Sequence, residues 1–252
     1  MSKIALITGA TAGIGAACAR FFAAEGYSLM LTGRREHLLE VLKNKIENEF
    51  KVKVLTLCFD VRDNQAVESH LGNLPAEWQT IDVLLNNAGL AKGFSDIQDG
   101  DLNHWETMID TNIKGLLYVS KVIVPLMVKR KQGHIVNIGS IAGKEVYPKG
   151  NVYCATKHAV DALTKGMRID LLPHKIKVSS VCPGAVNTEF SKVRFDGDEA
   201  KAETVYEGYE PLLAEDIAEA IFFVVSRPSR VNINDLLIMP TAQANSAHLL
   251  RE

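Results

Sequence analysis

Long apolar runs, closely spaced cysteines and an excess of charge of one sign are all missing from these 252 residues. The longest apolar stretches, VIVPLMV and AIFFVV, are far shorter than the roughly 20 residues that a membrane-spanning helix needs. The first residues, MSKIALITGA, lack the longer apolar region and the small-residue cleavage site of a secretory signal peptide. We therefore expect neither a membrane partner nor export.

The charges almost cancel, because 28 Lys and Arg oppose 30 Asp and Glu for a net charge of −2. No basic stripe indicates nucleic acid, so we expect no nucleic-acid partner. The four cysteines, Cys18, Cys58, Cys154 and Cys182, are widely spaced and form no Cys-x-x-Cys pair. This spacing is typical of reduced thiols in a cytoplasmic protein, and it predicts neither a disulfide framework nor a metal site.

Hydrophobic residues make up 47% of the chain, which is enough for a sizeable core. Short apolar runs rich in β-formers alternate with longer segments of helical spacing, and this alternation predicts an α/β fold, a doubly wound parallel sheet of seven strands with helices on both faces. No Pro/Gly/Ser-rich linker divides the chain, so we expect a single domain over 1–252. The predicted strands are 3–8, 28–32, 53–58, 82–87, 134–140, 177–183 and 235–240, and the predicted helices are 13–26, 36–50, 64–74, 105–130, 151–172 and 214–226.

One charged and weakly periodic stretch, which begins NTEFSKVRFDGDEAKAETVY, interrupts this rhythm before the last predicted helix. Connections of this length in compact domains are often lids or binding loops. We interpret 187–206 as a substrate-binding lid, with a surface excursion of no binding role as the alternative.

The first predicted strand runs into TGATAGIG, residues 8–15, which opens a helix. Gly9, Gly13 and Gly15 allow a tight turn and a close backbone approach, and a helix N-terminus attracts the pyrophosphate of a dinucleotide. The spacing is Gly-x-x-x-Gly-x-Gly. Glycines also serve ordinary turns, so the loop indicates a dinucleotide site only because it lies between a strand and a helix.

The end of the second predicted strand, LTGRR, indicates which dinucleotide fits. An NAD site carries an acidic residue here for the ribose 2′-hydroxyl, but Gly33 stands at this point. Arg34 and Arg35 follow, and guanidinium groups match a 2′-phosphate. The pattern favours NADP, unless the two arginines are only solvated residues at the end of a strand.

The stretch YCATK places Tyr153 one helical turn from Lys157. On a helix these side chains share a face, and a neighbouring ammonium favours the phenolate. A packed tyrosine beside a surface lysine is the alternative reading of the pair, so the surrounding motifs must decide.

Further motifs surround this pair in a fixed order: TGATAGIG, NNAG at 86–89, Asn112 in DTNIKG, Ser140 in NIGSIAG, Tyr153 with Lys157, and PG at 183–184 followed by Thr188. In this order and spacing the motifs resemble the short-chain dehydrogenase/reductase family over nearly the whole chain, including its Rossmann-type fold. Within that family, three stretches are similar to the NADP-dependent 3-hydroxy acid dehydrogenases, which include serine 3-dehydrogenase: GNVYCATKHAV, TEFSKVRFDGDEAKAETVY and VNINDLLIMPTAQA.

The resemblance implies a role for each catalytic residue. Tyr153 is the expected acid/base, and Lys157 with the positive charge of the nicotinamide is expected to lower the pKa of its phenol. Ser140 is expected to hold the substrate oxygen, and Asn112 to anchor a water that relays protons to Lys157. The cofactor contacts that it implies are Gly9, Thr11, Gly13, Ile14, Gly15, Arg34, Arg35, Asp60, Val61, Asn87, Ala88, Gly89, Tyr153, Lys157, Pro183, Gly184, Val186 and Thr188.

The resemblance further implies a homotetramer that oxidises small β-hydroxy acids or reduces 3-oxo acids and aldehyde acids. One departure concerns the glycine loop, where Ala12 replaces the basic residue of some NADP-dependent relatives, so phosphate recognition rests on Arg34 and Arg35. Two alternatives stay open. One is a 3-oxoacyl thioester or general carbonyl reductase of the same family, and the other is a non-catalytic NADPH-sensing protein.

An acid substrate requires a cation near the catalytic pair, and the expected lid offers Lys192 and Arg194. We select Arg194 as the substrate-binding residue, because a planar guanidinium holds a carboxylate through two hydrogen bonds. The alternative is that Arg194 is a solvated charge, or is tied to the acidic DGDE stretch nearby.

Overall fold

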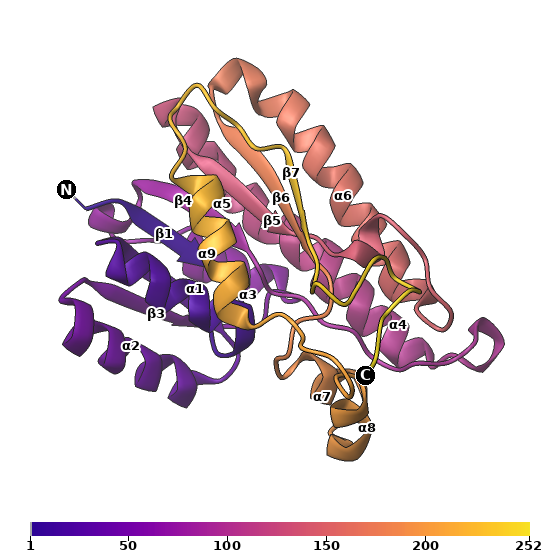
Figure 1. Cartoon of the computed structure of the whole chain (residues 1–252). Coiled ribbons are helices and arrows are strands. Elements are labelled where there is room, and N and C mark those ends of the chain that lie inside the picture. Colours follow the sequence, from indigo (N-terminus) through magenta and orange to yellow (C-terminus); the bar gives the residue numbers. More distant parts are fainter. Residues whose placement is uncertain (1) are drawn as a thin grey trace.

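The computed structural model describes residues 2–252 and shows one parallel seven-stranded sheet (Figure 1). The strand order is β3-β2-β1-β4-β5-β6-β7, so the chain changes direction across the sheet between β1 and β4. Ligands of such sheets bind where the order reverses, beyond the carboxyl ends of the strands. The strands are β1 (Ile4–Ile7), β2 (Ser28–Gly33), β3 (Val54–Cys58), β4 (Ile81–Asn86), β5 (His134–Ile138), β6 (Lys177–Pro183) and β7 (Asp235–Ile238).

Helices cover both faces of this sheet, as the near-continuous apolar strands predict. Ile7 and Leu85 pack in one apolar cluster with helices α1 and α9, whereas Leu6 and Leu84 pack in another with α3 and α5. The helices are α1 (Gly13–Ala24), α2 (Glu36–Phe50), α3 (Asn64–Leu71), α4 (Leu102–Ile109), α5 (Leu116–Arg130), α6 (Asn151–Leu171), α7 (Phe190–Arg194), α8 (Glu199–Thr204) and α9 (Ala214–Val225). The predicted α/β class and all seven predicted strands are confirmed.

The predicted helix 105–130 begins earlier than expected and is not uniform. It runs from Leu102 to Arg130 and contains a π-helical turn, Asp110–Gly115, between α4 and α5. By length and composition alone this segment could cross a membrane, and 44% of its most apolar window is buried inside the structure. Core helices of soluble proteins pass the same test, and here Val119, Ile123 and Met127 pack in the apolar cluster beneath α5.

The expected lid 187–206 is partly regular, because it contains the short helices α7 and α8. Figure 1 shows these two helices beside the C-terminus, apart from the layers that cover the sheet. Backbone contacts hold this arrangement, since the amide of Glu252 donates to the carbonyl of Gly208 at 2.8 Å. The segment 187–206 thus lies in an ordered lobe between β6 and α9, and its role as a substrate-binding lid stays a prediction.

Candidate active site

The loop between β1 and α1 has the shape that its glycines predict. Gly9 and Gly13 adopt φ of +67° and +50°, in the left-handed region that favours glycine. A side chain at Gly15 would lie only 2.3 Å from the carbonyl oxygen of Gly9. Ala12 precedes α1 and provides no capping side chain, which leaves the first amides of the helix available to an anion.

This loop borders a pocket of about 240 Å³ at the carboxyl ends of the central strands. The strand register explains how distant motifs meet there, because the ends of β1, β4, β5 and β6 lie side by side. The predicted site residues that line the pocket are Gly9, Thr11, Gly13, Ile14, Arg35, Asn87, Ala88, Gly89, Ser140, Tyr153, Lys157, Pro183, Gly184, Val186 and Thr188. The predicted residues outside its lining are Gly15, Arg34, Asp60, Val61, Asn112 and Arg194.

Ser140, Tyr153 and Lys157 come together in the pocket from two elements. Ser140 follows β5, and its hydroxyl accepts a hydrogen bond from the amide of Ala142 at 3.1 Å. Tyr153 and Lys157 lie on α6, with the Lys157 ammonium 6.0 Å from the centre of the tyrosine ring. Lys157 Nζ donates to the carbonyl of Ile138 at 2.8 Å, and the three side chains predicted to be catalytic are all buried.

Burial controls the ionisation of this pair. It raises the pKa of the Tyr153 phenol, and the charge of Arg194 and the neighbouring Ser140 hydroxyl offset this only in part. Burial lowers the pKa of Lys157 from 10.5 to about 8. The protein groups alone therefore do not produce the lowered phenol pKa that the sequence predicts. The reason is that burial of the phenol outweighs the nearby positive charge of Arg194, while Lys157 donates to the Ile138 carbonyl.

Asn112 lies in the π-helical turn with its side-chain amide engaged on both sides. Its Oδ1 accepts from the amide of Leu90 at 2.8 Å, and its Nδ2 donates to the Leu90 carbonyl at 2.8 Å and to Thr156 Oγ1 at 3.0 Å. A Cβ on Gly89 would be 3.3 Å from Asn112 Oδ1 and 3.6 Å from Lys157 Nζ, so Gly89 lies between them. Asn112 thus fixes the loop after β4, and its part in a proton relay stays a prediction.

The two arginines after β2 have different environments. Arg35 lines the pocket, donates to Thr11 Oγ1 at 3.0 and 3.2 Å, and forms an ion pair with Glu189 at 3.0 Å. Arg34 is exposed and lies 3.7 Å from Asp60. Glu189 also lines the pocket, and sequence reasoning did not identify it. Its position directly after Thr188 is the signal in the sequence that could have pointed to it.

Asp60 and Val61 follow β3 at the same edge of the sheet. Burial opposes ionisation of Asp60, but hydrogen bonds from Arg62 and the charge of Arg34 outweigh it and lower the pKa of the carboxyl. Val61 is buried, and a Cβ on Gly115 would lie 2.7 Å from its side chain. These residues extend the site away from the catalytic trio, beyond the edge of the pocket.

Arg194, the last residue of α7, lies within an aromatic cage that the sequence did not reveal. Its guanidinium carbon is 5.2 Å from the centre of the Tyr153 ring and 5.6 Å from the rings of Phe94, Tyr147 and Phe190. Nη2 donates to the Tyr147 hydroxyl, while the buried Nε has no hydrogen-bond partner within residues 2–252.

No carboxylate of that described part of the chain lies within 4 Å of Arg194, because the nearby acids pair elsewhere. Asp196 pairs with Lys92, Asp198 with Lys201, and Glu199 with Lys192. The alternative in which the DGDE stretch neutralises Arg194 is therefore not observed. A cation held against Tyr153 without a counter-ion can receive an anionic group.

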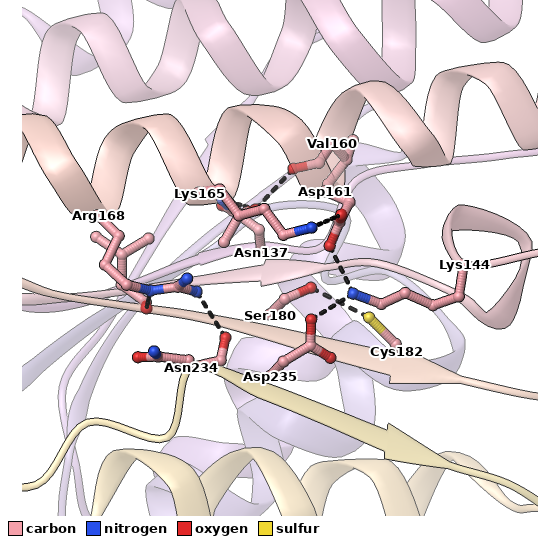
Figure 2. A network of polar contacts seen from close by, with 12 residues as sticks. Asn137, Lys144, Val160, Asp161, Lys165, Arg168, Ser180, Cys182, Asn234 and Asp235 are labelled. Atoms are coloured by element: carbon pink, nitrogen blue, oxygen red, sulfur yellow. Dashed lines mark hydrogen bonds and ion pairs between the residues drawn. The ribbon is translucent and has the colours of Figure 1, made fainter.

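A polar network around Lys144 joins the turn after β5 to α6 and β7 (Figure 2). Lys144 follows the short helical turn Ile141–Gly143 after Ser140, and it forms ion pairs with Asp161 at 2.6 Å and with Asp235. Asp161 lies on α6 one turn after Lys157, and Asp235 begins β7. Burial opposes the charge of Lys144, but its bonds to the two carboxylates raise the pKa of the ammonium.

Comparison with known proteins places this site in context. Residues 3–199 match the family model of short chain dehydrogenases. The NADP-dependent 3-hydroxy acid dehydrogenase of Salmonella typhi is 46% identical over 242 residues, 96% of each chain. Sulfoacetaldehyde reductase 2 of Chromohalobacter salexigens is 47% identical over 248 residues, 98% of each chain. A solved serine dehydrogenase, in a closed form complexed with NADP⁺, superimposes with a TM-score of 0.92 at 44% identity over 99% of each chain.

Proposed function

The chain belongs to the short-chain dehydrogenase family, and from this premise we propose that it transfers a hydride between NADP and a small 3-hydroxy acid or the corresponding 3-oxo or aldehyde acid. It is an NADP-dependent oxidoreductase that acts on CH–OH groups. The observation that supports an acid substrate is the position of Arg194. Its guanidinium carbon lies 5.2 Å from the centre of the Tyr153 ring, and no carboxylate of the described chain neutralises its charge.

The residues of the pocket fit a dinucleotide. The left-handed glycines bring the backbone close to a phosphate, and a Cβ at Gly13 would lie 3.2 Å from the side chain of Thr188. Arg34 and Arg35 would hold the 2′-phosphate, and Lys157 would contact the nicotinamide ribose. When bound, the nicotinamide supplies or accepts the hydride.

The other tasks belong to this chain. Ser140 orients the substrate oxygen, and Tyr153 holds the proton that this oxygen gains or loses. Burial keeps the phenol protonated, which suits donation to a carbonyl oxygen. For the oxidation of an alcohol, positive charge next to the phenol must favour the phenolate, and Arg194 and Lys157 are the cations within reach.

The substrate carboxylate is assigned to Arg194. Its Nε and Nη2 form one side of the guanidinium, the side that holds a carboxylate through two parallel bonds. The surrounding aromatic rings exclude water and strengthen this attraction. A sulfonate presents the same charge to a guanidinium, so a sulfonated aldehyde is a second candidate substrate, supported by the similarity to sulfoacetaldehyde reductase 2.

The test compares a 3-hydroxy acid with its uncharged alcohol analogue in wild-type enzyme and in Arg194→Leu. We expect Arg194→Leu to lower kcat/KM for the acid by roughly ten- to a hundredfold, the effect of one charged hydrogen-bonding pair, with little change for the alcohol. Lys192→Leu is the matched control, because Lys192 lies on the same helix and pairs with Glu199. Equal losses on both substrates would place carboxylate recognition elsewhere.

Two alternative functions are addressed by the same assays. Acyl thioesters and simple ketones test a reductase with broader substrates, which would prefer them to the acids. Tyr153→Phe tests a non-catalytic NADPH-sensing protein, since a sensor keeps its properties whereas an enzyme loses turnover by orders of magnitude and still binds cofactor. We further propose that the protein forms a homotetramer, as the family resemblance implies, and that it lies in the cytoplasm.

A further inference from the structure

A second cavity, of about 850 Å³, lies at the opposite end of the sheet from the cofactor pocket. Its walls include Lys3 before β1, His134 at the start of β5 and Lys177 at the start of β6. The ends of α6 and α9 complete it. We propose that this basic cavity binds a small anion with two or more negative charges, separately from NADP and substrate. Its cationic residues are Lys3, Lys131, Arg168, Lys175, Lys177, Arg227 and Arg230.

The charge of this basic cavity is not compensated by the protein. Within residues 2–252, none of its seven cations lies within 4 Å of a carboxylate oxygen. Its one acidic residue, Asp82, already accepts from Arg130 at 3.0 Å and from the amide of Ile4 at 2.9 Å. The whole chain has a net charge of −2, so this positive region contrasts with the average charge of the molecule.

Several of these cations are held in place by backbone carbonyls, which leave their charge intact. Arg168 donates to Val178 O at 3.0 Å and to Asn234 O at 2.7 Å. Arg227 donates to the carbonyl of Phe223 at 2.9 Å and lies over its ring at 4.3 Å. Side chains that are already ordered lose little conformational entropy when an anion binds.

Lys177 and His134 in the cavity wall support the same conclusion. Lys177 is partly buried near the carbonyls of Arg227 and Val231, and burial followed by repulsion from Lys3 and Arg227 lowers the pKa of its ammonium. An anion would relieve that repulsion. His134 is 3% exposed, and its Nε2 is 2.8 Å from Ser179 Oγ, whereas its Nδ1 has no partner within the described chain. A His134 tautomer that accepts from Ser179 leaves Nδ1–H as a buried donor without a partner in a residue that lines the cavity.

The class of ligand follows from the number of cations. A monovalent anion would neutralise one of seven charges, whereas adjacent anionic groups on one small molecule engage several at once. Phosphoryl groups and clustered carboxylates share this chemistry. Pyrophosphate and citrate therefore serve as the two probes, and acetate serves as the monovalent comparison.

The test is calorimetric titration of the enzyme saturated with NADP, at low and constant ionic strength. We expect one pyrophosphate or citrate per chain, no saturable binding of acetate, and a higher thermal midpoint with the bound anion. Lys177→Met and Arg227→Met should each weaken binding by roughly tenfold, since each removes one charge-assisted contact. Arg227→Met keeps an apolar stem over Phe223. Arg230→Met is a further variant, and because Arg230 is exposed its replacement should not disturb the fold.

Lys45→Met on α2 is the matched control, because it removes one positive charge from a residue that does not line the basic cavity. Weakening by Lys45→Met equal to that by Lys177→Met would show diffuse attraction only and overturn the proposal. Competition of pyrophosphate with NADP would place the anion in the cofactor pocket and overturn it as well. Lack of saturable binding in the wild-type enzyme would have the same consequence, and none of these outcomes bears on the activity with acids.

Discussion

Tyr153 and Lys157 are buried in one pocket, and burial favours the neutral form of each side chain. For the tyrosine this means a proton ready for donation, and for the lysine a charge that is retained only at a cost. Lys157 offsets part of that cost by its bond to Ile138 O. Burial thus holds the phenol in its protonated form, and the positive charge that would make it a better acid has to come from groups beside it.

This cost predicts a pH dependence of stability. Lys157 has a pKa of 10.5 when unfolded and about 8 when folded, so the unfolded chain binds more protons between these values and the free energy of unfolding rises with pH there. Above pH 10.5 the lysine is neutral in both states, and the stability gained by not burying a charge is complete. This stability is lost as the pH falls through about 8, where the buried lysine becomes charged. Replacement by Met removes this dependence.

Thermal denaturation of wild-type enzyme and Lys157→Met between pH 7 and pH 10 checks the prediction. The wild type should gain stability relative to the variant as the pH rises. Lys165→Met, which removes an exposed lysine of the same helix, should stay parallel to the wild type. A difference between wild type and Lys157→Met that is independent of pH contradicts the assigned pKa.

Of the two arginines after β2, Arg35 is engaged more closely by the protein, because its guanidinium lies 3.0 Å from Glu189 whereas that of Arg34 lies 3.7 Å from Asp60. Its partner Glu189 occupies the guanidinium that a 2′-phosphate would bind. We expect Arg34→Leu and Arg35→Leu each to lower kcat/KM with NADP by roughly ten- to a hundredfold and to change activity with NAD little. Glu189→Gln should improve the affinity for NADP, because it removes a competitor for Arg35.

Fluorescence titration and steady-state kinetics with both cofactors measure these effects. The wild-type enzyme should prefer NADP, since no acidic residue stands at Gly33. A wild-type preference for NAD would contradict the assignment of both arginines. Unchanged NADP affinity in Glu189→Gln would show that the ion pair to Arg35 does not compete with the phosphate.

At the scale of elements, the catalytic residues depend on how α6 is held against the turn after β5. Gly143 leaves no room for a side chain, because a Cβ there would lie 2.6 Å from the carbonyl oxygen of Lys157. Lys144 then fastens this turn to α6 through Asp161 and to β7 through Asp235 (Figure 2). Ser140 and Lys157 are thus each four residues from a member of one ion-pair network.

We expect Lys144→Met to lower kcat by roughly tenfold, because misplaced reacting groups are costly, while KM for NADP changes little. Lys165→Met is the matched control, since Lys165 also pairs with Asp161 but within the same helix. Lys144→Arg should restore most of the rate by remaking the ion pairs. If Lys165→Met lowers kcat as much as Lys144→Met does, the effect comes from a general disturbance of α6, and the link between α6 and the turn after β5 has no specific role.

At the scale of the whole molecule, the sheet separates two charged sites. The carboxyl ends of its strands carry the cofactor pocket, and the amino ends carry the basic cavity. Light scattering after size-exclusion chromatography tests the proposed homotetramer, and we expect about four times the mass of one chain. A monomer with full activity would contradict the homotetramer and would show that one chain forms the complete active site.

The sequence by itself determined the α/β class, the strands, the glycine loop and the motif of Tyr153 and Lys157. These features are local, because hydrophobic period, glycine conformation and helical spacing are properties of short segments. It also determined that Arg34 and Arg35 follow β2 without a carboxylate at Gly33.

Only the tertiary structure decided which side chains meet. The aromatic cage of Arg194 combines residues from three separate stretches of the chain, around 94, 147–153 and 190–194. The partners of Glu189 and Lys144, Arg35 and Asp235, lie far away in sequence. The tertiary structure also decided the ionisation of Tyr153 and Lys157, because desolvation depends on all the groups packed around a side chain. Contacts and burial arise from the folded packing of distant segments, and no local pattern encodes them.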